Sequence, residues 1–261
     1  MKKRNIMFLI GMLYLLTRTP VWAEEPFEIS IEPKSISIGT FYDGTDIMVS
    51  GKIPDDCEAV AVFAGDRNVL HLKEKGKVIG LLWMNLDSLT YNNVPNVFLV
   101  SSQKRVEDMT GPKEDEKSNV KNMGLAGLSK SITVESEKSD PQISIAELFK
   151  LKNHEGLYQE QTGNISYTTP AQGYKSFRIN IGIPSRLSPG NYTTNVYIVR
   201  NGQIIGRAEE HVEAGLTGIP AFLSTLAFDH SLMYGILATI IAIAGGLVVG
   251  YIFQSAKEGS H

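Results

Sequence analysis

Cysteine is almost absent from this chain: of 261 residues, only Cys57 carries a thiol. An intramolecular disulfide needs two thiols, so none can form in any compartment. A cysteine-based metal or redox centre is excluded for the same reason. Cys57 also lies far from the N-terminal region in which a lipoprotein carries its acylated cysteine. We expect Cys57 to be a small, partly buried residue, with intermolecular pairing as the alternative.

The motifs of common enzymes are missing too. We find no nucleophile elbow, P-loop, dinucleotide-binding motif or zinc motif. Each histidine stands alone, without a second histidine or a cysteine at metal-binding spacing: His71, His154, His211, His230 and His261. We therefore predict a non-enzymatic protein without metal or cofactor. An enzyme is the third-ranked hypothesis, because catalytic triads assemble in space from distant residues.

Basic residues are the minority among the charged ones. The chain has 25 Lys and Arg against 28 Asp and Glu, a net charge of −3. Four basic residues lie before residue 24, where no acidic residue occurs, so 21 basic and 28 acidic residues remain beyond that point. Phosphate backbones are bound by clustered Lys and Arg, so we expect no nucleic acid partner.

The first residues have the pattern of an export signal. Residues 2–4 are basic, residues 6–16 form an apolar run too short to span a bilayer, and Val21-Trp22-Ala23 precedes two glutamates. This predicts a signal peptide over residues 1–23 that is cleaved after Ala23. An uncleaved N-terminal anchor is the alternative.

Charge is absent from residues 232–253. About 20 such residues cross a hydrocarbon core of about 30 Å, so we predict a C-terminal transmembrane helix there. Export of the N-terminus would place residues 24–215 outside and the tail, residues 254–261, in the cytoplasm. The expected location is the bacterial cytoplasmic (inner) membrane, crossed once. Lys257 gives this orientation only weak support from charge.

Small residues recur at every fourth position of this span: Ala238, Ala242, Gly246 and Gly250. Residues four apart share a helix face, and small side chains let two membrane helices approach closely. We predict that this face packs against a helix of another integral membrane protein. The alternative is that Gly and Ala are simply common in membrane helices.

Residues 216–231 are predicted to form a juxtamembrane amphipathic segment. Apolar residues follow Pro220, which suits the first turn of a helix. Asp229, His230 and Tyr234 then fall at the level of the lipid headgroups. A proton-relay role for Asp229 or His230 is the less favoured interpretation.

Alternating apolar residues from Phe27 onward predict half-buried antiparallel strands. Short apolar runs at about 8–12-residue spacing favour a sandwich over a parallel sheet, and Asn201-Gly202 predicts a hairpin turn. We predict an all-β, immunoglobulin-like sandwich over residues 24–215. Trp83 and Tyr91 are expected in its core, with a ligand groove as the alternative.

An insertion is predicted over residues 101–170. Residues 101–142 carry seven basic and eight acidic residues and few large apolar ones, which indicates a solvated surface or linker. Ser144 and Glu147 form a capping-box pattern. They predict a short helix over residues 145–155 that docks on the sandwich.

Four stretches together are similar to a known family: 31–51, with Ile31-Glu32-Pro33 and Tyr42-Asp43-Gly44; 80–98, with Gly80-Leu81-Leu82-Trp83-Met84 and Asn93-Val94-Pro95; 149–158, with Gly156-Leu157-Tyr158; and 177–192, with Ile183-Pro184 and Pro189-Gly190-Asn191-Tyr192. The chain resembles the bacterial putative transmembrane protein family first described from alphaproteobacteria, the uncharacterised single-pass proteins of Alph_Pro_TM type. The resemblance implies an uncharacterised protein whose genes are often near a permease of the sulfite or sulfonate exporter type. It supplies no catalytic residues, and the charged central segment departs from the family pattern.

The leading hypothesis is therefore a non-enzymatic, membrane-anchored periplasmic accessory protein, with an anion exporter as the implied partner. The alternative is a ligand-binding or adhesion module displayed at the membrane, which would use a sheet face or the insertion.

Overall fold

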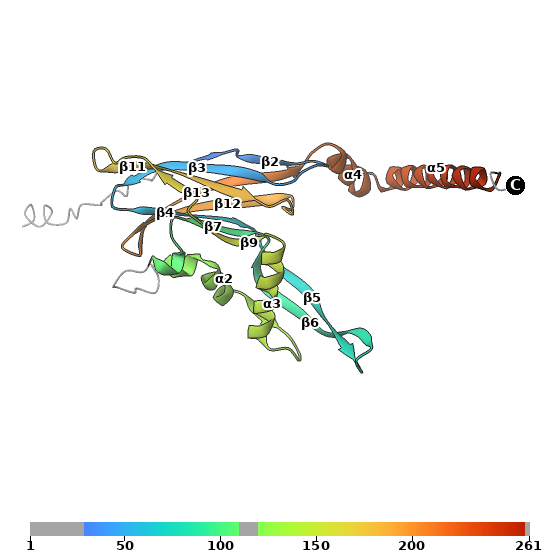
Figure 1. Ribbon diagram of the computed structural model, residues 1–261, viewed down its shortest axis with the longest axis horizontal. Coiled ribbons are helices and arrows are strands. Elements are labelled where there is room, and N and C mark those ends of the chain that lie inside the picture. The colour runs from blue at the N-terminus through green and yellow to red at the C-terminus, as the bar shows by residue number, and fades with distance from the viewer. Residues whose placement is uncertain (1–28, 110–119, 259–261) are drawn as a thin grey trace, which may run out of the picture.

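The computed structural model describes residues 29–109 and 120–258, with side chains to residue 253. The predicted signal peptide, residues 1–23 with Ala23 at its end, lies outside the described residues. Figure 1 shows a β-rich body from which one long helix extends at the C-terminal end.

A four-stranded antiparallel sheet forms one layer of the body. Its strands, in order, are β1 (Ile29–Glu32), β3 (Thr45–Pro54), β11 (Tyr174–Ile183) and β10 (Ile165–Tyr167). Apolar side chains alternate along β3 and β11, and those that point inward are buried. This period of two is the one the sequence predicts for strands with one solvated face.

A six-stranded sheet forms the second layer. Its order is β2 (Ser35–Ile38), β13 (Gln203–Leu216), β12 (Gly190–Arg200), β4 (Glu58–Gly65), β7 (Phe98–Ser102) and β9 (Tyr158–Thr162). The two outermost pairs, β13 with β2 and β7 with β9, are parallel, and the others are antiparallel. Asn201 (φ 50°) and Gly202 (φ 77°) turn β12 into β13, which confirms the predicted hairpin.

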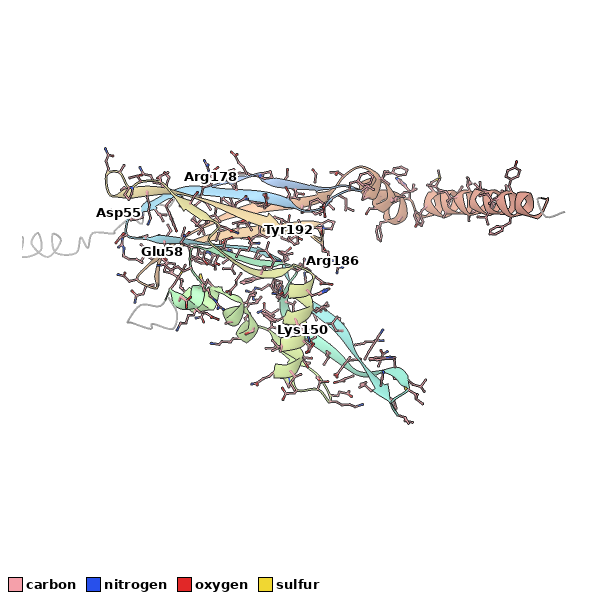
Figure 2. All side chains as sticks on the ribbon, viewed as in Figure 1. Asp55, Glu58, Lys150, Arg178, Arg186 and Tyr192 are labelled. Carbon is pink, nitrogen blue, oxygen red and sulfur yellow. The ribbon has the colours of Figure 1, made fainter. Side chains whose placement is uncertain are left out.

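The core lies between these two sheets. The rings of Phe63 and Tyr192 stack there with centroids 5.1 Å apart, and Figure 2 shows Tyr192 between the layers. Cys57 is fully buried, in line with its expected structural role. The body, which is mostly β-sheet, and the one C-terminal apolar helix confirm the predicted fold class. The immunoglobulin-like assignment stays a prediction. The two parallel strand pairs of the six-stranded sheet differ from the antiparallel sheets of immunoglobulin domains.

Helices cover the outer face of the six-stranded sheet. These are α2 (Leu125–Ser131) and α3 (Pro141–His154), preceded by two short 3₁₀ turns, Val106–Asp108 and Val120–Met123. Phe149 of α3 meets Tyr158 of β9 edge to face at 5.2 Å. Because this face is covered, β4 is buried on both sides and reads as an unbroken apolar run.

Two expectations for the predicted insertion, residues 101–170, need correction. First, β9 and β10 fall inside it, yet they are strands of the two main sheets. Second, α3 begins at Pro141 rather than residue 145, and its N-cap is Asp140, whose carboxylate accepts hydrogen bonds from the backbone N–H groups of Gln142 and Ile143. Ser144 instead donates its hydroxyl hydrogen to the Asp140 carbonyl at 2.9 Å. An Asp-Pro pair caps a helix as well as a capping box does.

A third sheet projects from the body. It consists of the hairpin β5 (Arg67–Val78) and β6 (Leu82–Pro95), with β8 (Thr133–Glu135) added near the base. In Figure 1 this hairpin extends away from the sandwich and slants toward the end that carries the C-terminal helices. Those helices are α4 (Ile219–Phe228), which follows β13, and α5 (Ser231–Glu258).

Candidate membrane and interaction sites

Helix α5 is the first candidate site. Residues 231–253 form 23 residues of mean hydropathy 2.4, none of which is buried against the body. Within the described residues this is the helix that is long and apolar enough to cross a membrane. Helical geometry continues to Glu258, so the first residues of the predicted tail extend the same helix.

The four small residues predicted to pack against a partner lie on this helix, one turn apart and exposed: Ala238, Ala242, Gly246 and Gly250. A methyl group added at Gly246 or Gly250 would meet no atom within 4 Å. The structure thus leaves this face uncovered, and no contact of the described body tests the predicted helix packing.

Helix α4 is a short apolar helix that connects the body to α5. Gly218, with φ at 65°, turns the chain out of β13, and Pro220 occupies the first turn, as the sequence predicts. Phe222 and Phe228 are 58% and 85% exposed. Asp229 and His230 follow in the junction to α5, both exposed. Apolar rings beside a membrane-length helix suit the lipid interface.

The tip of the β5–β6 hairpin is the second exposed apolar region. Trp83 is 67% exposed, so its expected place in the core was wrong, whereas Tyr91, further down β6, is 1% exposed and donates a hydrogen bond to the Ser144 carbonyl at 3.0 Å. The run that contains Trp83 surrounds a turn at Ile79 and Gly80, both with positive φ. Gly80 is the sequence signal that could have predicted this turn, because a glycine within an apolar run can separate two strands.

A polar cluster lies midway along the same hairpin. One carboxylate oxygen of Asp87 accepts from the Ser136 hydroxyl at 2.6 Å and from the backbone N–H of Lys138 and Ser139 at 3.1 and 3.2 Å. These hydrogen bonds, that of Ser136 foremost, hold the pKa of Asp87 well below its usual range. They tie β6 to the loop that leads into α3.

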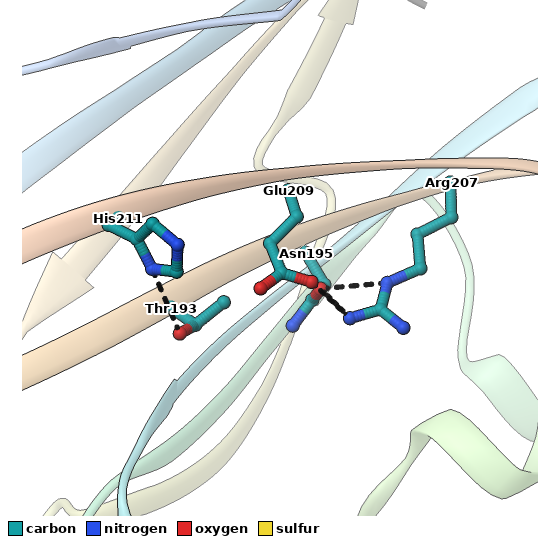
Figure 3. A network of polar contacts seen from close by, with 5 residues as sticks. All are labelled: Thr193, Asn195, Arg207, Glu209 and His211. Atoms are coloured by element: carbon teal, nitrogen blue, oxygen red, sulfur yellow. Dashed lines mark hydrogen bonds and ion pairs between the residues drawn. The ribbon is translucent and has the colours of Figure 1, made fainter. Parts of the chain in front are cut away.

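A groove of about 480 Å³ lies between α2 and the outer face of the six-stranded sheet. Figure 3 shows its polar wall: the Arg207 guanidinium donates two hydrogen bonds to the Asn195 amide oxygen, at 2.9 and 2.6 Å, and pairs with Glu209. Thr193 and His211 lie beside them, 3.5 Å apart. Apart from His211, the sequence does not mark these residues as a site, because they are spaced like those of any solvated strand face.

Two of the described histidines contact threonine side chains. His71 contacts Thr90, at 3.1 Å, and His211 contacts Thr193. Across residues 29–109 and 120–258, no three His, Cys, Asp or Glu side chains are grouped so that they could hold a metal ion. His261 lies outside the described residues.

One family model matches the chain from residue 26 to residue 255, and its description is "Putative transmembrane protein (Alph_Pro_TM)". No curated protein matches the chain. The match covers both sheets, the hairpin, α4 and the whole apolar part of α5. With this extent of agreement, the chain belongs to the Alph_Pro_TM family of transmembrane proteins.

Proposed function

We propose that this protein is a non-enzymatic accessory subunit, anchored by α5 in the bacterial inner membrane with its β body on the periplasmic side. The observation that carries the proposal is the uncovered small-residue face of α5. Lipid tails offer helices no hydrophobic drive to associate, so pairing depends on close backbone contact. Ala238, Ala242, Gly246 and Gly250 permit that contact, and the body leaves them free to make it.

The partner in this proposal is a second integral membrane protein. The family resemblance suggests an anion exporter of the sulfite or sulfonate type. The lack of catalytic motifs supports a binding role rather than chemistry on a substrate. Export through a signal peptide, residues 1–23, would give the orientation that the proposal requires.

The test is affinity purification of the full-length protein from its own membranes. A variant with Ala242→Leu and Gly246→Leu should lose an integral membrane protein that the unaltered chain retains, because two leucines separate the backbones. The matched control is Ala244→Leu with Val248→Leu, which adds bulk to the opposite face and should retain the partner. Recovery of the chain alone in all three samples contradicts the proposal.

A second function, display of a ligand-binding module, is favoured by the groove beside α2. Its guanidinium, carboxylate and amide groups stand in fixed positions, as in sites for small polar ligands. Titration of the full-length protein with sulfite and short alkanesulfonates should then raise its melting temperature saturably. Arg207→Met should remove that rise, and Arg186→Met, outside the groove, should preserve it.

A further inference from the structure

The tip of the β5–β6 hairpin exposes more large apolar side chains than a solvated turn needs. Its five members are 52–89% exposed: Ile79, Leu81, Leu82, Trp83 and Met84. Single exposed apolar residues are common on proteins, but a contiguous group marks an interaction surface. We call these five residues the hairpin tip.

Isoleucine is an unfavourable residue for the backbone conformation at position 79. Ile79 has φ at 53°, in a turn where Asn or Gly would fit without strain. A β-branched residue is disfavoured there, and its side chain gains no burial in return, since Ile79 is 89% exposed. Folding of the hairpin therefore does not account for an apolar residue at this position.

Charge around the tip has one sign. Between Glu74 and Asp87 the chain has two basic residues, Lys75 and Lys77, and no acidic one. The Lys77 ammonium lies 5.3 Å from the centre of the Trp83 ring. Tryptophan and lysine beside aliphatic side chains is the composition of segments that enter the interfacial layer of anionic membranes.

The hairpin reaches the level of α4, the helix that precedes the membrane span. In Figure 1 the tip ends level with α4 along the long axis of the molecule, the axis along which α5 extends. A bilayer perpendicular to α5 would therefore meet α4 and the tip together. The Asp87 hydrogen bonds, midway along the hairpin, and β8, nearer its base, hold the hairpin to the segment that leads into α3 and so set the direction in which the tip projects.

We propose that the hairpin tip is a second membrane contact: it enters the interfacial layer of the leaflet that faces the body, with Lys75 and Lys77 at anionic headgroups. This contact is independent of any protein partner of α5. It needs only the bilayer in which α5 is anchored.

Trp83 provides the probe. The chain has two tryptophans, Trp22 and Trp83, so full-length protein with Trp22→Phe reports on the tip alone. We would reconstitute it into vesicles of phosphatidylcholine and phosphatidylglycerol whose acyl chains carry bromine just below the headgroups. Trp83 fluorescence should be strongly quenched and shifted to the blue relative to protein in detergent. Quenching should weaken in purely zwitterionic vesicles and after Lys75→Gln with Lys77→Gln.

Two variants control the measurement. Leu81→Asp with Leu82→Asp alters side chains that are already exposed, so the fold should persist by circular dichroism while the quenching disappears. Trp83→Phe with Tyr174→Trp moves the probe to the start of β11, at the other end of the body, and should show background quenching only.

Two outcomes overturn the proposal. If Trp83 remains open to aqueous iodide in anionic vesicles, the tip does not reach the bilayer. If its emission shifts to the blue without quenching by bromine, and does so more at higher protein density, the tip contacts a second copy of the chain instead. Both outcomes leave the proposed packing of α5 standing, since these vesicles contain no partner.

Discussion

Lysine substitutions within α5 test whether this helix crosses the membrane. The 23-residue span contains eleven strongly apolar residues: Leu232, Ile236, Leu237, Ile240, Ile241, Ile243, Leu247, Val248, Val249, Ile252 and Phe253. At about −0.3 to −0.6 kcal/mol each, they contribute roughly −3 to −7 kcal/mol to insertion. A lysine near the helix centre costs about 2.5–3.5 kcal/mol and also removes one apolar residue.

Ile240→Lys alone should therefore weaken insertion by about 3–4 kcal/mol and leave most of the chain in the membrane. Ile240→Lys together with Leu247→Lys should cost about 6–8 kcal/mol, which cancels the whole apolar contribution. The fraction of full-length chain that resists alkaline carbonate extraction from membranes should fall only in the double variant. Ile240→Leu with Leu247→Ile changes the same positions and should extract like the unaltered chain.

Full carbonate resistance of the double lysine variant would refute this reasoning. Determination of the N-terminal residue in the same samples separates the two explanations. A chain that begins at Glu24 and still resists extraction is held by something other than α5. A chain that keeps residues 1–23 is held by an uncleaved N-terminal anchor, the alternative that the sequence leaves open.

Three further predictions concern the β body. Burial raises the pKa of Tyr192 to about 12, so the contribution of Tyr192 to the unfolding free energy should be constant below about pH 10 and fall by about 2–3 kcal/mol as the pH rises to 12. The difference in unfolding free energy between the unaltered chain and Tyr192→Phe, measured in denaturant titrations, should change by that amount over the same pH range. Asp140→Ala should lower stability by about 0.5–2 kcal/mol through loss of the α3 N-cap, whereas Asp140→Asn should retain most of it; an equal loss in both would contradict the capping role. Tyr91→Phe removes the hydrogen bond to Ser144 and should cost about 0.5–1.5 kcal/mol, with faster amide exchange at the start of α3.

The strands of the two main sheets were predictable where one face of the strand is buried and the other is solvated. Strands β3 and β11 show this directly, because burial of one face imposes an alternation that the sequence must carry. The Asn201-Gly202 turn was predictable because both residues accept positive φ. The C-terminal span was predictable because hydrocarbon excludes charge over a fixed length.

Strand β9 shows why other elements were missed. Its sequence, Tyr-Gln-Glu-Gln-Thr, has no apolar alternation, yet it pairs in parallel with β7 at the edge of the six-stranded sheet. Backbone hydrogen bonds to β7 and the single buried ring of Tyr158 hold this strand, and neither requires an alternating sequence. The prediction for the hairpin tip was wrong for the opposite reason. An apolar run predicts burial, but the sequence does not say what would cover the run. Nor could it place Arg207 beside Asn195, since that contact depends on strand register.

A single membrane helix leaves its body free to rotate about the helix axis and to tilt. An accessory subunit that must lay α5 along a partner helix gains from a second contact that restricts the tilt. The hairpin tip lies off the α5 axis and level with α4, so its insertion would hold the body at one tilt relative to the bilayer. Helix α5 would then keep one angle to the membrane before any partner arrives, which lowers the entropy lost on association. Leu81→Asp with Leu82→Asp should therefore weaken partner recovery without altering α5, and less severely than Ala242→Leu with Gly246→Leu.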